Sequence, residues 1–190
     1  MLGCHAAVGL LALCLPLAAA LSDGAPLGAC SKMTPFHNGV SGQTGPSPHK
    51  LNVTRLNGSV QVTIMGPDYR GLLLQAKKPG DSVSFGNWSI PPSNTKTIAC
   101  FNKENSAITH SNTNPKNRNV VYTWNPPPSK DCVKVEFVAT VAQSREIYWV
   151  NLKSDEMDLG LTAEPSFVAI GTLVNSPCAE GNCYCIAALV

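Results

Sequence analysis

Charged residues are scarce in this chain of 190 amino acids, because aspartate, glutamate, lysine and arginine together make up only 14% of it. The formal net charge is +2, and the 14 lysines and arginines are scattered rather than gathered into a stripe. Proteins that bind nucleic acid need clustered basic residues to neutralise the phosphates. We therefore expect no nucleic-acid partner.

Long helical patterns and internal repeats are also missing. After residue 20, no apolar period of 3.6 residues lasts beyond two turns, whereas glycine and proline each occur 15 times. This composition favours turns and short strands over helices. The length is that of one domain with or without a tail, which is enough to bury a core.

The common motifs of nucleophilic catalysis and of metal binding are absent from the sequence. There is no Gly-x-Ser-x-Gly string, and the acids Asp155, Glu156 and Asp158 do not follow the spacing of a calcium loop. Cys183 and Cys185 have no second close cysteine pair with which to hold zinc. We therefore predict no catalytic residue, no metal and no cofactor, and a binding module rather than an enzyme.

The N-terminus has the pattern of a secretory signal peptide. An apolar run over residues 6–21, interrupted by Pro16, ends in three alanines at 18–20, although no lysine or arginine precedes it. A transmembrane anchor is the alternative, but the run is short for a bilayer core, which needs about 20 apolar residues. We predict a signal peptide at residues 1–20 and a secreted, extracellular protein with no membrane span in its mature part.

Cysteines and glycosylation sequons agree with export. Six cysteines remain after residue 20, an even number that suits disulfides in an oxidising compartment. They are Cys30, Cys100, Cys132, Cys178, Cys183 and Cys185. N-glycosylation sequons begin at Asn52, Asn57 and Asn87, and we expect these side chains to face solvent and Trp88, inside the third sequon, to be partly exposed.

Alternation of apolar and polar residues predicts about seven short strands separated by turn residues, which is the pattern of a β-sandwich. The expected strands are residues 60–65, 72–76, 83–85, 95–101, 120–124, 133–141 and 147–152. Residues 21–51 are expected to form an irregular arm and residues 102–119 an exposed polar connection, because neither segment alternates.

Several strings resemble the reeler (reelin-type) domain in order and spacing. They are GAP at 24–26, AC at 29–30, MTPFH at 33–37, GLLLQA at 71–76, IAC at 98–100, VYTWN at 121–125 and YWV at 148–150. The resemblance implies an all-β, immunoglobulin-like sandwich in which the arm is bridged to a later strand by Cys30 and Cys100. Reeler domains occur at the front of reelin and the spondins, precede a cytochrome module in ferric-chelate reductase-like membrane proteins, and stand alone in small secreted defence proteins of insects.

The other expectations concern the tail, the histidines and the function. We divide the chain into a signal peptide at 1–20, a reeler domain at 21–153 and a cysteine-containing tail at 154–190. Four cysteines beyond the bridge allow three pairings, so the partner of Cys132 stays open. We expect the histidines to be exposed loop residues, except that His37 should fix the arm by hydrogen bonding.

The expected partner is an extracellular protein, matrix component or glycan. For the function, the alternatives to an extracellular binding module are an innate-immune defence protein that adheres to microbial surfaces and a shortened form of a ferric-chelate reductase-like membrane protein.

Overall fold

A computed structural model describes residues 22–128 and 133–159. The predicted signal peptide at 1–20, Cys132 and the tail cysteines Cys178, Cys183 and Cys185 lie outside the described residues. No helix within the described ranges is long and apolar enough to cross a membrane.

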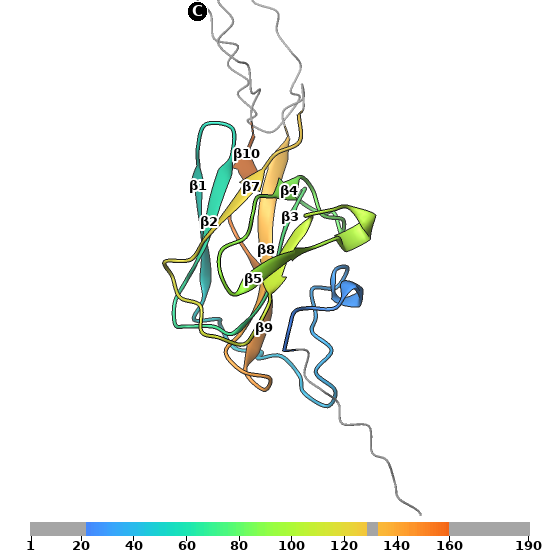
Figure 1. Cartoon of the computed structure of the whole chain (residues 1–190), viewed down its shortest axis with the longest axis vertical. Coiled ribbons are helices and arrows are strands. Elements are labelled where there is room, and N and C mark those ends of the chain that lie inside the picture. The colour runs from blue at the N-terminus through green and yellow to red at the C-terminus, as the bar shows by residue number, and fades with distance from the viewer. Residues whose placement is uncertain (1–21, 129–132, 160–190) are drawn as a thin grey trace, which may run out of the picture.

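The described chain consists of ten strands and two short 3-10 helices joined by loops (Figure 1). The strands are β1 (Lys50–Arg55), β2 (Val60–Met65), β3 (Gly71–Lys77), β4 (Asn87–Trp88), β5 (Thr95–Ile98), β6 (Ala107–His110), β7 (Val121–Asn125), β8 (Lys134–Ala142), β9 (Tyr148–Lys153) and β10 (Met157–Asp158), with the 3-10 turns at Leu27–Ala29 and Cys100–Asn102.

Two antiparallel sheets pack face to face. One has the order β1-β2-β7-β4; the other has the order β10-β8-β3-β6-β5, with β9 also paired to β8. In Figure 1 the β1–β2 hairpin and β7 form one layer, and the arm, coloured blue, lies beside β5 and β9 on the far side of the other layer. The predicted all-β, immunoglobulin-like sandwich is confirmed.

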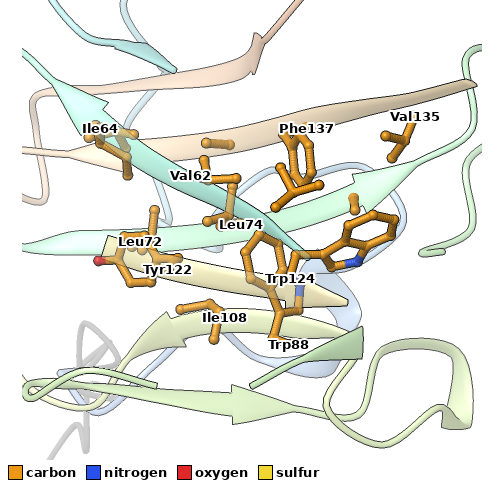
Figure 2. Close-up of a cluster of buried hydrophobic side chains, with 14 of the residues drawn as sticks. Val62, Ile64, Leu72, Leu74, Trp88, Ile108, Tyr122, Trp124, Val135 and Phe137 are labelled. Atoms are coloured by element: carbon orange, nitrogen blue, oxygen red, sulfur yellow. The ribbon is translucent and has the colours of Figure 1, made fainter. Parts of the chain in front are cut away.

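Alternating side chains from both sheets fill the core (Figure 2). Val62 and Ile64 point inward from β2 and Leu74 from β3, and each is fully buried. The ring of Trp124 on β7 meets that of Phe137 on β8 edge-on at 5.4 Å. Full burial of one such side chain stabilises the fold by about 1.5–3 kcal/mol, so this cluster holds the two sheets together.

Trp88 corrects one sequence-based expectation. We expected partial exposure because Trp88 belongs to a sequon, but its side chain is 3% exposed and packs against Phe137. Successive residues of a strand face opposite sides, so Asn87 on β4 is exposed while its neighbour is buried. A sequon therefore gives the exposure of its asparagine and not of the residue that follows.

Several strands differ from the predicted pattern. The strand predicted at 83–85 is reduced to an isolated bridge between Lys77 and Ser84, β4 was not predicted, and the strand predicted at 95–101 ends at Ile98. β1 lies partly inside the expected arm, and β6 lies inside the expected exposed connection although Ala107, Ile108 and Thr109 are buried. β6 has only four residues, too few for alternation to be recognised. β10 adds a short pair to β8 beyond Lys153, the last residue of the predicted domain.

Candidate functional site

The arm, residues 22–49, crosses the outer face of the β3–β8 sheet, the face turned away from the other sheet. Thr109 on β6 and Thr140 on β8 both pair with Leu73 on β3, so these three side chains form a row on this face. The hydroxyl of Thr109 accepts a hydrogen bond from Ala25 N at 2.8 Å, and that of Thr140 donates to the carbonyl oxygen of Met33. Irregular backbone that is buried needs such partners, so the row fixes the arm.

A disulfide joins the arm to the sheet next to this row. Cys30 and Cys100 are bonded with their Cα atoms 5.7 Å apart, which is the pairing that the family resemblance implied. Gln75, fully buried on the same face, donates from Nε2 to Cys30 O at 3.1 Å. Met33 and Val138 pack around the bridge in a second apolar cluster, separate from the sandwich core.

The other end of the arm is held by His37 and Tyr148. His37 Nδ1 lies 2.8 Å from Arg145 O, and its ring meets the Tyr148 ring edge-on at 5.1 Å. Tyr148 Oη donates to Val40 O at 2.8 Å. His37 therefore has the expected role of fixing the arm by hydrogen bonding, and the arm is anchored on both sides of the segment between Met33 and His37.

A cavity of about 210 Å³ lies between the two anchors, with the arm as one wall and the sheet as the other. Most of its lining is apolar, and the basic groups of the lining are two arginines and two histidines. The lining residues are Ser22, Gly24, Ala25, Pro26, Ala29, Met33, Pro35, Phe36, His37, Arg70, Gly71, Leu72, Leu73, His110, Thr113, Thr140, Ala142, Ser144 and Arg145.

The charged side chains of this lining are all basic. Arg70 precedes β3 and Arg145 lies in the β8–β9 turn, and neither aspartate nor glutamate lines the cavity. Arg70 Nη1 donates to Thr113 O at 2.9 Å, and Arg145 Nη2 donates to Asn38 O at 3.0 Å. Glu146 approaches Arg145 only at 3.9 Å and is largely exposed. Since a guanidinium has five N–H donors, both arginines keep donors for a ligand.

Lys116 shapes the loop beside Arg70. Its side chain is buried, and Nζ donates to the carbonyl oxygens of Arg70 at 2.9 Å, Asn112 at 3.0 Å and Asn114 at 2.9 Å. Burial, and to a lesser extent the charge of Arg70, lowers the pKa of Lys116 to about 8. These contacts fix the loop that carries Thr113 to the cavity.

A family model for the reeler domain matches residues 28–165, which is most of the chain and includes both disulfide cysteines and the cavity lining from Ala29 onward. The chain belongs to the reeler family.

Relatives of this reeler domain include proteins of similar length and much longer ones. A putative defense protein of Bombyx mori is 34% identical over 78% of this chain and 91% of that protein. Defense protein l(2)34Fc of Drosophila melanogaster is 30% identical over 78% of this chain and 96% of that protein. A putative ferric-chelate reductase 1 of Danio rerio is 26% identical over 74% of this chain, but the match spans only 26% of that protein.

Among solved structures, the crystal structure of the human F-spondin reeler domain is similar, with 21% identity and a TM-score of 0.49. That similarity covers 63% of this chain and 94% of the F-spondin fragment.

The sequon asparagines of the reeler domain lie away from the cavity. Asn52 is on β1, Asn57 in the β1–β2 turn and Asn87 on β4, and all three are exposed. β1 and β4 are the two edges of the four-stranded sheet, whereas the cavity lies on the outer face of the other sheet. Glycans at these positions would therefore leave the cavity open.

The expectation that histidines are exposed loop residues is wrong for His49. Its side chain is 2% exposed and lies edge-on to Tyr69 at 6.1 Å and to Trp149 at 5.6 Å. His110 ends β6 and lines the cavity. Within the described ranges, no three His, Cys, Asp or Glu residues gather as a metal site would require.

Sequence reasoning missed Arg70, Arg145 and His110 as cavity residues. Each lies at or near the end of a strand, in a polar stretch that has no motif of its own. Their approach to one cavity depends on the strand order of the sheet, which a local pattern does not contain.

Proposed function

We propose that this reeler domain is a secreted binding module without catalytic activity, and that the arm cavity is its ligand site. The observation that carries this proposal is a cavity with apolar walls and basic groups, held between a disulfide anchor and the His37–Tyr148 anchor. The hydroxyl and imidazole groups of the lining, such as Thr140 and His37, already hold the arm in place. Such a preformed hollow with a few polar groups is typical of binding sites.

Secretion is supported by features spread along the chain. The signal-like residues 1–20 precede a buried disulfide, which persists in oxidising compartments, and three exposed sequon asparagines. We expect the protein recovered from culture medium to begin at Leu21 and to lose mass on treatment with an N-glycosidase. Retention of Met1 in that material would overturn the export proposal.

If the protein is secreted, its ligand is extracellular, so the binding test uses extracellular candidates. Purified secreted protein is applied to immobilised matrix proteins and microbial surface glycans, beside an Ala142→Leu variant that fills the cavity. A Thr63→Leu variant, which adds a similar apolar group on the other sheet, is the control. Binding by the wild type and the control, with loss in Ala142→Leu, supports the proposal. Equal binding by all three would move the ligand site away from the cavity.

A defence role is the second candidate. It is supported by the insect relatives named defense proteins, whose length this chain matches over 91% and 96%. The ferric-chelate reductase 1 match, which covers 26% of the Danio rerio protein, supports a third candidate, a shortened form of such a membrane protein. Adhesion to intact microbial cells, measured by cosedimentation, favours the defence role. A transcript that continues past codon 190 into further domains favours the third candidate.

A further inference from the structure

The size of the cavity limits the group that it can enclose. An apolar cavity of about 150 Å³ holds one benzene ring, whereas sites for drug-sized ligands measure about 300–1,000 Å³. The arm cavity, at about 210 Å³, lies between these values. It therefore has room for one ring or one short alkyl chain, and a longer molecule would extend through the mouth.

The walls indicate that this enclosed group is apolar. Met33 and Leu73, both nearly fully buried, line the cavity from the arm and from β3. Methionine is unbranched and fills irregular space, so this wall can adapt to a ring or to a chain. The backbone of Met33 is held at φ = +54°, a conformation that few non-glycine residues adopt and that is often found at ligand sites. The bond from Thr140 to Met33 O keeps it there.

The mouth of the cavity is apolar as well. Phe36 lines the cavity and yet is 62% exposed, and its ring packs over Gly28, where a Cβ atom would come within 3.1 Å of it. Leu27, 61% exposed, precedes that glycine. Phe36 therefore places an exposed apolar ring at the edge of the cavity, where it can contact the part of a ligand that extends outward.

The charge of the cavity lining indicates the chemistry of the polar end of the ligand. Arg70 and Arg145 reach the cavity from different turns, and the lining itself contains no carboxylate. The exposed Glu146, outside the lining, lies 3.9 Å from Arg145. Guanidinium groups bind carboxylates through paired, charge-assisted hydrogen bonds. An anionic group is complementary to this pair, while a cationic ligand would be repelled.

We propose that the arm cavity binds a short alkyl or aryl carboxylate, with its apolar group against Met33 and Leu73 and its carboxylate at Arg70 and Arg145. This assignment rests on the proposed function, since it names the ligand class of the same site. A free fatty acid has this chemistry, whereas the esterified acyl chain of a larger amphiphile has the apolar group without the carboxylate, and the test includes both.

The test titrates full-length secreted protein with octanoate, with octylammonium as the matched cation and octanol as the neutral form, by calorimetry and by NMR. We expect octanoate to bind with an affinity at least about tenfold higher than that of octylammonium, because one charge-assisted contact is worth roughly that factor. Equal binding of all three probes would overturn the assignment of an anion. A lysophospholipid micelle that binds while octanoate does not would assign the site to a larger amphiphile and would also overturn the proposal.

Variants locate the bound carboxylate. Arg70→Gln with Arg145→Gln should weaken octanoate binding about tenfold or more, whereas Arg118→Gln, an exposed arginine outside the cavity, should leave it unchanged. Arg145→Lys keeps the positive charge but not the guanidinium that bonds to Asn38 O. If the charge is decisive, this variant should bind octanoate more tightly than Arg145→Gln. Loss of octanoate binding in Arg118→Gln as well would assign it to general surface charge and overturn the site.

The two proposals fail in different ways. If octanoate does not bind but Ala142→Leu still abolishes binding to the matrix or glycan panel, the ligand class is wrong and the cavity remains the binding site. If octanoate binds in an Arg70- and Arg145-dependent manner but Ala142→Leu leaves panel binding unchanged, the cavity has a ligand and the proposed partner surface lies elsewhere. Thermal unfolding of each variant confirms that it is folded.

Discussion

The two faces of the β3–β8 sheet are both covered, but by different kinds of structure. On the inner face, Leu74 and Phe137 meet the strands of the second sheet in a cluster of apolar side chains (Figure 2). On the outer face, Leu73 and Val138 meet the irregular arm, and the buried polar residue Gln75 lies among them. One sheet therefore has a regular partner on one side and an irregular one on the other.

The difference between the faces follows from backbone hydrogen bonding. The strands of the second sheet satisfy their own N–H and C=O groups, so the side chains between the sheets are free to be apolar. The arm forms no ladder with the sheet and has a single backbone bond to it, from Gln43 N to Tyr148 O on β9, so Thr109, Thr140 and Gln75 supply further hydrogen bonds to its backbone. Polar side chains and a disulfide therefore replace regular pairing on the outer face, and an imperfectly filled space, the cavity, remains there.

Among the changes that test this difference between the two faces, removal of the disulfide should cause the largest loss in the free energy of unfolding. Cys30→Ala with Cys100→Ala frees a loop whose ends are 70 residues apart, for which the chain-entropy model predicts a loss of roughly 4 kcal/mol in the free energy of unfolding. Denaturant unfolding measures the loss, and hydrogen exchange should show faster exchange in the arm than in β2 and β7. Uniformly faster exchange would mean that the outer face is as essential to the fold as the inner one.

The tyrosine pair tests the inner face. Tyr69 Oη and Tyr122 Oη lie 2.8 Å apart and fully buried, and burial raises the pKa of Tyr69 to about 12. Tyr122→Phe leaves the Tyr69 hydroxyl without its partner and should cost about 1–3 kcal/mol in the free energy of unfolding. Tyr69→Phe with Tyr122→Phe should cost less than the sum of the single changes, because no unpaired group remains. Additive losses would show that the hydrogen bond contributes little.

The inner face could be predicted from the sequence and the outer face only in part. Val62 and Ile64 on β2, and Val135 and Phe137 on β8, alternate with polar residues over enough positions to identify each strand. The arm has no period, because its structure depends on contacts with residues far along the chain, such as the pairing of Cys30 with Cys100. The family resemblance, and not the local pattern, supplied that pairing.

The cavity itself was beyond sequence reasoning. The polar residues Thr109 and Thr140 are ordinary in strands, and nothing local indicates that their hydroxyls hold an arm. Arg70 and Arg145 are turn residues, and their placement at one cavity depends on the order β8-β3-β6. His37 could be singled out because it lies in a string typical of the family, and its contact with Arg145 O agrees with the expected role.

The second anchor of the arm should matter less than the first. His37→Ala removes the hydrogen bond to Arg145 O and the ring contact with Tyr148, and we expect a loss of about 1 kcal/mol in the free energy of unfolding. His37→Asn, which retains a donor on a short side chain, should lose less. Thermal unfolding compares the two variants. A loss as large as that of the disulfide variant would mean that both ends of the arm contribute equally.

Substitution of His49 gives the smallest expected effect on stability, because the effect of its titration is confined to a narrow range of pH. The imidazole lies between Tyr69 and Trp149, buried where the arm enters β1. Desolvation by burial lowers the pKa of His49 below its usual value, although the nearby backbone of Met65 partly opposes this. The folded protein therefore holds the neutral form, while the unfolded chain binds a proton near pH 6.5.

The sign of the pH dependence follows from this difference in proton binding. Between pH 6.5 and the lowered pKa the unfolded chain binds more protons, so the contribution of His49 is fully present above about pH 6.5 and is lost as the pH falls through that window. The melting temperature should therefore fall between pH 7 and pH 5, and the fall should be smaller in both His49→Phe and His49→Gln. Phenylalanine keeps the ring contacts with Tyr69 and Trp149, whereas glutamine keeps a polar group, so a smaller slope in both variants isolates titration from packing. An unchanged slope in both would assign the acid sensitivity to other groups and leave the buried His49 a packing residue alone.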